Sequence, residues 1–547
     1  MKPTLIVMMG PAGTGKAQPV DTVIPTPSGD KKLGDIEVGD YVFDRLGKRT
    51  KVLGVFPQGK IDTYKVTLTD GRETFCNEEH LWTCYTSKGN FKTLSLKEMM
   101  EQGIREKSKK TGQKGGCRFC IPRHKNLEYS HKEYRVAPYI VGAFLGDGCC
   151  LQKPLTISSA DYEIVSKINA YLPFDSFPKK NSGRNYNWEF HFNNNKKLKN
   201  NSGVRYKAIQ TSQLFSEKDL YTSVCCKSYE KRIPERYLYG DKQQRLELLR
   251  GLLDTDGSIS KDSRGTITFT STSLGLVKDV RKLCISLGFE GRNIYEDIRK
   301  KKKYTKSCYN MTISVPSYYR SEVFSLSRKK KRGANSFEKN PNPHKNWKYI
   351  GIDKVEKMPF QTEMVCIYVE NEEHLYLTND CIVTHNTFLA EEIKKSHEDT
   401  IIVSRDKIRF ALLQPEDDYF AVEPAVIRQY YYNINFGLQN HAYVIADATH
   451  LSKRSRKQFF RNVKTDNIRV VGIWVEVPLE IALKQNRQRT GRACVPEEVI
   501  KQMYKSKFTP QDDEPFDEII YVNPHEDMAL GRVGTGITSI KEKLHLI

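Results

Sequence analysis

Short apolar runs separated by helix-like segments occupy the two ends of the chain. The run "LIVMM" at residues 5–9 is matched, far along the sequence, by "TIIVS" at 400–404, "AYVIADAT" at 442–449 and "IRVVGIWVEV" at 468–477. Apolar runs of this length that alternate with amphipathic helices are typical of the strands of a parallel sheet. The two ends therefore predict a single α/β domain wound around a parallel sheet.

The middle of the chain carries a different pattern, which occurs twice. "YIVGAFLGDG" at 139–148 and "LLRGLLDTDG" at 248–257 each read as a short apolar helix that ends in Asp-Gly. Each is followed by a strand, a polar turn and an amphipathic helix, at 155–172 and at 267–288. The repetition predicts two pseudosymmetric halves of one domain.

A phosphate-binding loop begins after the first strand and is then interrupted. "GPAGTGK" at 10–16 fits G-x-x-x-x-G-K, but the Ser or Thr that should follow is Ala17. Joining Lys16 directly to Thr387 gives "GPAGTGKTFLAEEIKK", a complete loop that runs into an amphipathic helix. A block of 370 residues, Ala17 to Asn386, therefore separates the two halves of the loop.

Length and charge extend this picture. A chain of 547 residues exceeds one ordinary domain, and its net charge of +22 is partly clustered in "RKKKKYTK" at 299–306 and "RKKKR" at 328–332. Such runs are often solvated loops, but two of them in a basic chain favour a nucleic-acid partner. No run of about 18 apolar residues is present, so we expect a soluble, cytoplasmic protein without a membrane partner.

The thirteen cysteines are irregularly spaced, which favours reduced thiols over a disulfide framework. Cys117-x-x-Cys120 with His124 could begin a zinc site. No second C-x-x-C follows at zinc-finger spacing, so we expect these side chains to serve ordinary packing.

The two edges of the block resemble those of an intein, a self-excising protein. The upstream edge "AQPVDTVIPTPSGDKKLGDIEVGDYVFD" is similar to the first intein block, and "HLYLTNDCIVTHN" followed by Thr is similar to the terminus. "GRETFCNEEHLWT" is similar to the block that supplies a Thr-x-x-His, although here it reads Asn77-x-x-His80. The resemblance implies an all-β splicing domain of the Hint fold that needs no cofactor.

Each matching residue has a chemical role in that resemblance. His80 would twist the upstream peptide bond and polarise the Lys16 carbonyl. Asn386 would cyclise onto its own carbonyl and cut the downstream bond, with His385 protonating the leaving amine or polarising that carbonyl. Thr387 would carry the upstream segment as an ester before an O-to-N shift restores a peptide.

The first residue of the block departs from the common intein pattern, because Ala17 stands where a cysteine usually opens the reaction. One intein subclass opens instead with an internal cysteine, and its three marks match Cys366, Trp82 and Thr384 in this chain. The resemblance favours attack by Cys366 on the Lys16 carbonyl. The alternative is that Ala17 replaces a cysteine and traps an ordinary precursor, with Cys366 a buried, inert thiol.

The paired Asp-Gly helices resemble the LAGLIDADG motifs of homing endonucleases. Close packing through Gly142 and Gly251 would bring Asp147 and Asp256 together, where Mg²⁺ would neutralise them. The resemblance implies cleavage of a double-stranded DNA homing site, with the first basic run as a source of phosphate contacts. Lys231 matches a lysine near the metal in related inteins, or else is a surface ion-pair partner. A degenerate DNA-binding remnant is the alternative.

The segments outside the block resemble phage polynucleotide 5′-kinases. "VSRDKIRFAL" would supply the general base Asp406 and the substrate-binding Arg409, and "IADATHLSKRSR" would place Asp447 near the acceptor. "VPLEIALKQNRQRTGRACVPEEVIKQMYKSK" is similar to the lid, in which Arg489, or its neighbour Arg487, would embrace ATP phosphates. The acceptor would be a 5′-hydroxyl nucleic acid; another small P-loop kinase or an ATPase is the alternative.

ATP would be held by the loop, with Mg²⁺ on the Thr387 hydroxyl. The residues expected to cradle or neutralise its phosphates are Gly10, Gly13, Gly15 and Lys16.

These patterns predict a multidomain, monomeric chain from a bacterial or phage-infected cell. The expected parts are an α/β P-loop kinase at 1–16 and 387–547, an all-β splicing domain at 17–130 and 335–386, and an α+β LAGLIDADG endonuclease at 131–334.

Overall fold

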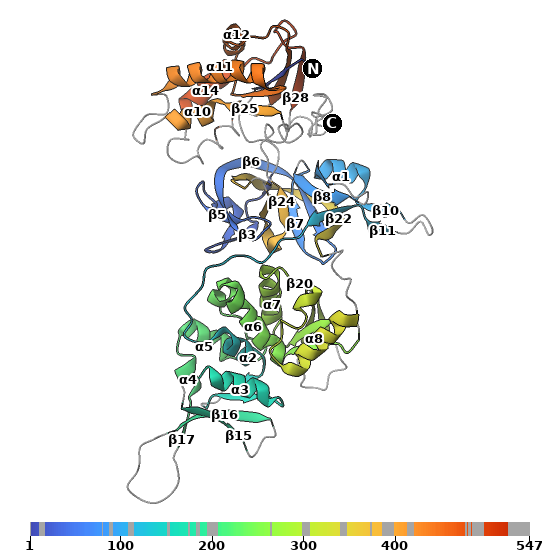
Figure 1. Ribbon diagram of the computed structural model, residues 1–547, viewed down its shortest axis with the longest axis vertical. Helices are drawn as coiled ribbons and strands as arrows, with labels where there is room; N and C mark the ends of the chain where they lie inside the picture. The colour runs from blue at the N-terminus through green and yellow to red at the C-terminus, as the bar shows by residue number, and fades with distance from the viewer. Residues whose placement is uncertain are drawn as a thin grey trace, which may run out of the picture.

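Three bodies follow one another along the long axis of the computed structural model (Figure 1). The body that contains both ends of the described chain lies at one end, a β-rich body lies in the middle, and a mixed α and β body lies at the other end. The structure describes residues 2–522 except 10–16, 79, 87–90, 108–113, 150–153, 173–174, 182–185, 194–205, 263–264, 298–306, 340–346, 372, 374, 386–398, 413–420, and 476–496 apart from 479 and 483.

The first body is built on a five-stranded parallel sheet in the order β25-β26-β1-β27-β28. β1 lies in the centre although almost 400 residues separate it from β25 in the chain. Its elements are β1 (Thr4–Met9), β25 (Thr400–Ser404), α10 (Arg405–Leu412), α11 (Glu423–Asn440), β26 (Tyr443–Asp447), α12 (Lys453–Asn462), β27 (Arg469–Val475), α14 (Glu497–Lys505) and β28 (Glu518–Val522).

The central position of β1 follows from its uniform apolarity. All six of its residues are buried, and successive side chains point to opposite faces of the sheet. Leu5, Val7 and Met9 accordingly pack in one hydrophobic cluster, and Ile6 and Met8 pack in another. A strand covered on both faces is what a doubly wound parallel sheet requires, so the predicted α/β sheet is observed.

The middle body is dominated by two long antiparallel strands, β6 and β22, which pair over most of their length. They belong to an eight-stranded sheet in which β2 pairs with β22 and β7 with β6. The elements are β2 (Gln18–Pro19), β3 (Val23–Thr26), β4 (Gly29–Lys32), η1 (Leu33–Asp35), β5 (Tyr41–Phe43), β6 (Arg49–Leu68), β7 (Glu73–Cys76), β8 (Leu81–Thr86), β9 (Phe91–Ser95), α1 (Leu96–Gln102), β10 (Arg105–Lys107), β11 (Lys114–Cys117), β12 (Phe119–Pro122), β22 (Tyr349–Val369), β23 (Leu375–Leu377), η4 (Asn379–Cys381) and β24 (Val383–His385).

The third body has the two repeated halves that the sequence predicts. One half contains α2, the sheet β13-β14-β16-β15 and α3, and the other contains α6, the sheet β18-β19-β21-β20 and α7. The elements are α2 (Pro138–Gly146), β13 (Gly148–Cys149), β14 (Thr156–Ser158), α3 (Tyr162–Ala170), β15 (Ser176–Lys180), β16 (Asn187–Asn193), β17 (Tyr206–Ala208), α4 (Thr211–Leu214), α5 (Lys218–Val224), η2 (Glu235–Tyr239), α6 (Lys242–Thr255), β18 (Gly257–Ile259), β19 (Ile267–Ser271), α7 (Leu274–Ser286), β20 (Glu290–Asp297), β21 (Cys308–Ser314), η3 (Ser317–Tyr319) and α8 (Ser327–Lys339).

Helices α2 and α6 meet at their glycines. A Cβ placed on Gly142 would collide with the Leu248 carbonyl, and a Cβ on Gly251 would lie 2.7 Å from the Ala143 backbone nitrogen. The absence of side chains therefore allows the two backbones to touch.

Helix α8 of the third body runs to Lys339, past the boundary set at 334. The helix expected at 387–396 lies outside the described residues. Within the described part of the chain, every helix is too short or too polar to span a bilayer.

Candidate splicing, nuclease and kinase sites

The upstream edge of the block is held in place by Asn77. The Ala17 N–H donates to Asn77 Oδ1 (3.0 Å), and the Asn77 N–H donates back to the Ala17 carbonyl (3.1 Å). Ala17 is fully buried against Ile61 and Met364. Asn77, which departs from the common Thr, thus contacts the nitrogen that would leave in the first splicing step.

The β-ladder brings the internal cysteine to the same place. Gln18 pairs with Val365 in the antiparallel ladder of β2 and β22. Continued by one residue, this register sets Ala17 opposite Cys366, where paired Cα atoms are about 5 Å apart. The Cys366 side chain is partly buried. Two residues 349 positions apart in sequence are therefore neighbours, as an internal-thiol route requires.

The block histidine and the terminal segment are also in contact. His80 Nε2 and Thr384 Oγ1 form a short hydrogen bond between β24 and the residue that precedes β8. The His80 ring packs edge-on against Trp82, with ring centroids 5.5 Å apart. His385 follows Thr384 on β24 and is almost completely buried. Four of the predicted splicing residues thus lie at the junction between β8 and β24.

A buried polar network that the sequence analysis missed connects the two edges. The Tyr376 hydroxyl donates to Gln18 Oε1 (2.8 Å), and Gln18 Nε2 donates to Thr74 Oγ1 (3.2 Å). Thr74 Oγ1 in turn donates to Asn379 Oδ1 (2.6 Å). Gln18 follows the upstream edge, and Asn379 begins the turn before β24. These amide and hydroxyl side chains have no reactive group that would have drawn attention to them.

The paired carboxylates of the third body follow directly on α2 and α6. Asp147 and Asp256 cap the C-terminal ends of these helices. Burial raises the pKa of Asp256 to about 7, and the nearby Asp147 adds to the increase. Burial also raises the pKa of Asp147, while Lys231 and Lys329 oppose it. Two neighbouring carboxylates whose pKa values are both raised, that of Asp256 partly by Asp147, are a donor set that fits a divalent cation.

Lys231 is buried at this site and does not lie on the surface. Its Nζ donates to the carbonyls of Phe144 (2.7 Å), Gly148 (3.0 Å) and Gly146 (3.3 Å). Its ammonium group therefore satisfies carbonyls at the end of α2 that have no helical partner. This places a positive charge next to Asp147.

Lys329 is the counterpart of Lys231 in the second half, and the sequence analysis missed it. Its Nζ donates to the carbonyls of Gly257 (2.6 Å), Leu253 and Asp254 (both 2.7 Å). Burial lowers the pKa of Lys329 to about 8, so the side chain stays charged at neutral pH. In the structure Lys329, Gly333 and Ser336 form a buried i, i+4, i+7 stripe of α8, but these residue types give no apolar signal in the sequence that would have found it.

The elements that carry the described kinase candidates Asp406, Arg409 and Asp447 meet at one edge of the parallel sheet. Met8, near the end of the strand that leads into the phosphate loop, pairs with Asp447, and Asp447 pairs with Ser404 on the other side. Helix α10 begins directly after Ser404 and contains Asp406 and Arg409. The carboxyl edge of such a sheet, where neighbouring loops leave it, is where ligands bind in open α/β folds.

Arg409 is held by an acidic partner. Its Nη2 donates to Glu423 Oε2 (2.8 Å), and Arg405 pairs with the same carboxylate. Burial alone would raise the pKa of Glu423, but the two arginines outweigh it and lower that pKa. Any acidic substrate group would therefore have to share Arg409 with Glu423 or displace Glu423.

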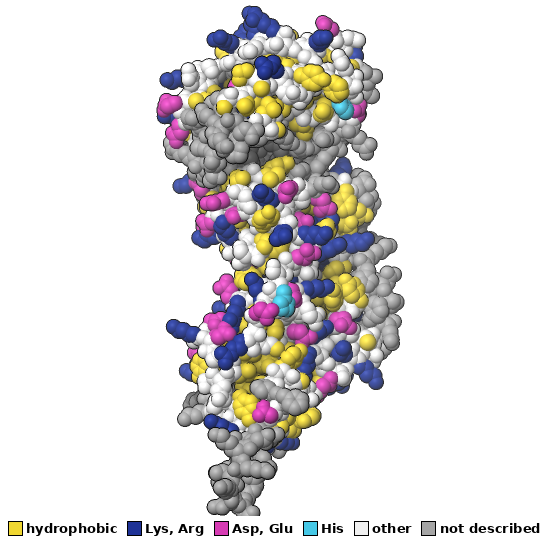
Figure 2. Space-filling model, turned by 60° about the vertical axis from the view of Figure 1, so that its left-hand side comes forward, with side chains coloured by type: hydrophobic (Ala, Val, Ile, Leu, Met, Phe, Trp, Pro, Cys, Tyr) yellow, Lys and Arg dark blue, Asp and Glu magenta, His cyan; other side chains and the backbone are white. Residues whose placement is uncertain are grey.

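Several predicted residues lie outside the described part of the chain: Gly10, Gly13, Gly15, Lys16, Asn386, Thr387, Arg487, Arg489 and the basic run from Arg299 to Lys303. His124 is described, and its Nε2 lies 2.7 Å from the Ile285 carbonyl of α7. The described residues include no group of three or more His, Cys, Asp or Glu side chains suited to a metal. On the face drawn in Figure 2, Lys and Arg side chains are interspersed with Asp and Glu over all three bodies.

Comparisons with known proteins match parts of this chain. The crystal structure of the gp41-1 intein aligns with 32% identity over 20% of this chain and 70% of its own, with a TM-score of 0.15. A family model described as a LAGLIDADG-like domain matches residues 243–323, inside the block. A model described as an AAA domain matches residues 387–510 and so begins at Thr387, the first residue after the block. The chain thus consists of a P-loop kinase-like host that is interrupted by an intein, and the intein carries a LAGLIDADG-like domain.

Two curated proteins are similar to parts of this intein-bearing chain. The replicative DNA helicase DnaB of Mycobacterium intracellulare is 27% identical over 412 residues, covering 72% of this chain and 62% of the helicase. The L-seryl-tRNA(Sec) kinase of Methanococcus maripaludis is 28% identical over 127 residues, covering 23% of this chain and 48% of the kinase. The chain thus spans about three fifths of the first relative and half of the second.

Proposed function

We propose that the chain is an unspliced precursor from which residues 17–386 excise themselves, joining Lys16 to Thr387. The observation that carries this proposal is the convergence of the two edges: the register of β2 with β22, continued by one residue, sets Ala17 opposite Cys366, and His80 contacts Thr384 beside the terminal His385. A core that served packing alone would have no need to gather these reactive groups at the ends of an inserted block.

In the proposed reaction, the Cys366 thiolate attacks the Lys16 carbonyl and the Ala17 amine leaves, which gives a thioester. Asn77 and His80 hold the departing amide. The Thr387 hydroxyl then takes the acyl group from sulfur, and Asn386 cyclises with release of the Thr387 amine. That amine attacks the ester and restores a peptide bond. No cofactor takes part.

Intact mass after expression tests the proposal. Complete splicing gives a 370-residue block and a 177-residue host, whereas a trapped precursor stays at 547 residues. Persistence of the 547-residue species under all conditions, with splicing restored by Ala17→Cys, would support the alternative that Ala17 replaces a catalytic cysteine.

We further propose that the LAGLIDADG-like domain cuts double-stranded DNA. Asp147 and Asp256 would hold Mg²⁺, which would supply charge neutralisation and an activated water. Lys231 and Lys329 position the two helix ends beside that ion. The natural target would be the uninterrupted host gene around the codons for Lys16 and Thr387, because the insertion destroys that site. Library cleavage with and without Mg²⁺ distinguishes a nuclease from a DNA-binding remnant.

For the spliced host we propose phosphate transfer from ATP to a 5′-hydroxyl nucleic acid. The loop with Lys16 and Arg489 would bind ATP, Thr387 would hold Mg²⁺, Asp406 would accept the hydroxyl proton, and Arg409 with Asp447 would contact the acceptor. The similarity to a tRNA-linked seryl kinase supports a small P-loop kinase with a different acceptor as the second candidate. Transfer of labelled γ-phosphate to 5′-hydroxyl oligonucleotides decides between them. We place the chain in the cytoplasm as a monomer.

A further inference from the structure

The turn that leads into the terminal strand has an unfavourable backbone. The Ile382 N–H donates to the Asn379 carbonyl (3.2 Å), which closes a tight turn between β23 and β24. Both central residues, Asp380 (φ 51°) and Cys381 (φ 52°), have positive φ. Turns of this type favour glycine at the second central position, and a residue with a side chain is strained in the left-handed region. Cys381 therefore needs support from the surroundings.

The intein's own splicing domain supplies part of that support. Arg72 Nη1 donates to the Asp380 carbonyl (3.0 Å), and Asp70 holds Arg72 through an ion pair of 2.7 Å. Strained turns persist only where several contacts define them together.

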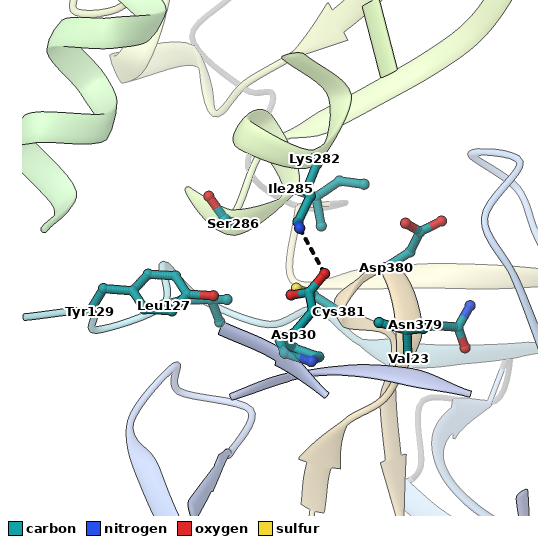
Figure 3. A pocket seen from close by; sticks show the side chains of 11 residues that line it. Val23, Asp30, Leu127, Tyr129, Lys282, Ile285, Ser286, Asn379, Asp380 and Cys381 are labelled. Atoms are coloured by element: carbon teal, nitrogen blue, oxygen red, sulfur yellow. Dashed lines mark ion pairs between the residues drawn. The ribbon is translucent and has the colours of Figure 1, made fainter. Parts of the chain in front are cut away.

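The endonuclease domain supplies the rest through helix α7. Arg281 Nη1 forms an ion pair with the Asp380 carboxylate (3.1 Å), and the next residue, Lys282, pairs with Asp30 of the neighbouring hairpin (2.7 Å). Figure 3 shows Lys282 reaching from α7 to Asp30 across a cavity that Asp380 and Cys381 also line. Asp380 of the turn is thus contacted by one arginine from each domain, Arg72 of the splicing domain and Arg281 of the endonuclease domain.

The turn is connected to both edges of the intein. β24 runs from it to His385, with Thr384 against His80. Asn379, its first residue, accepts from Thr74, which accepts from Gln18 beside Ala17. A change in the turn would therefore move the terminal His-Asn pair relative to the upstream edge.

We propose that helix α7 of the endonuclease domain positions the terminal turn of the intein for splicing, through the contact of Arg281 with Asp380. Arg281 is a positioning residue, and it touches no reacting atom. The domain inserted for DNA cleavage would then also serve the splicing reaction. This inference rests on the proposed splicing function.

The first test is Arg281→Met in the full chain, which keeps the packing of the side-chain stem and removes the charge. We expect cleavage at Asn386, followed by mass spectrometry, to slow about fivefold, the equivalent of about 1 kcal/mol. Thioester formation at the upstream edge should slow less, a split that general destabilisation would not produce. Arg281→Lys should restore part of the rate. Lys278→Met, an exposed position on the same helix, is the matched control.

Two further variants connect the effect to the turn. Asp380→Asn keeps the tolerance for positive φ and removes the charge, so Arg281→Met combined with it should be no slower than either alone. Cys381→Gly removes the backbone strain, so the effect of Arg281→Met should shrink in that background. DNA cleavage by each variant reports on the folding of the endonuclease.

The outcomes separate the two proposals. If the unmodified chain never splices, the proposed function fails. If the chain splices and Arg281→Met cleaves at the same rate as Lys278→Met, α7 has no positioning role. If Arg281→Met misfolds, an unchanged rate for Asp380→Asn overturns the inference on its own.

Discussion

At the scale of single residues, the identity of the nucleophile decides between the internal-thiol route and a trapped ordinary precursor. We predict that Cys366→Ala abolishes both upstream cleavage and ligation, because the register sets Cys366 opposite Ala17 and the first residue of the block is an alanine that cannot open the reaction. Intact mass should show no 177-residue product. Cys308→Ala, a partly buried cysteine of the endonuclease body, should splice normally. Efficient splicing of Cys366→Ala would exclude the internal-thiol route.

The paired carboxylates give a second residue-scale prediction. Asp147→Asn should reduce DNA cleavage in Mg²⁺ by at least about a hundredfold, because the amide is a poorer ligand for a hard cation than a carboxylate. Linearisation of a plasmid that carries the uninterrupted host site measures it. Asp175→Asn, at an exposed position of the same body, should leave cleavage unchanged. Equal cleavage by both variants would remove Asp147 from the metal site.

The individual residues also show which parts of the candidate sites could not be predicted from the sequence. His80, Thr384 and Cys366 were predicted because their chemistry is distinctive, whereas Gln18, Thr74 and Asn379 form a hydrogen-bonded network without any such mark. Lys329 was lost in a basic run that reads as solvated. Which face of a helix meets the core depends on its neighbours, and composition does not reveal them.

At the scale of elements, the seam between α2 and α6 should determine the integrity of the nuclease. We predict that Gly251→Ala lowers the free energy of unfolding of this body by about 2 kcal/mol and reduces DNA cleavage, because the new Cβ meets backbone atoms of α2 that have no room to yield. Thermal unfolding measures the loss of stability, and a plasmid cleavage assay measures the loss of nuclease activity. Gly116→Ala, whose Cβ would meet nothing within 4 Å, should change neither.

The parallel sheet and the two repeated halves were predictable, since alternating periodicity and repetition are local signals. The ladder of β6 and β22 was not, because it joins segments almost 300 residues apart whose register depends on bulges along both strands. The position of Cys366 beside Ala17 follows from the register of β22 with its other partner, β2, continued by one residue. The subclass resemblance pointed to Cys366, and only the fold shows which residue it faces.

At the scale of the whole molecule, the insert should silence the kinase without unfolding it. β1 already pairs with β26 and β27 although the block follows it in the chain, so the host sheet forms before splicing. The phosphate loop is different, because Lys16 and Thr387 must be consecutive for one to hold the phosphates while the other holds the Mg²⁺ that bridges them.

We therefore predict that a chain locked by Cys366→Ala together with Asn386→Ala transfers no phosphate from ATP, whereas a directly expressed 177-residue fusion with "GPAGTGKTFLAEE" does. Because Thr387 would act first as splicing nucleophile and later as metal ligand, Thr387→Ser should keep part of both activities and Thr387→Ala should lose both. Radiolabel transfer measures the kinase, and intact mass measures splicing. The fusion made with Thr387→Ala separates the roles, since it needs no splicing and should still lack activity. Comparable transfer rates from the locked chain and the fusion would show that the insert does not gate the kinase.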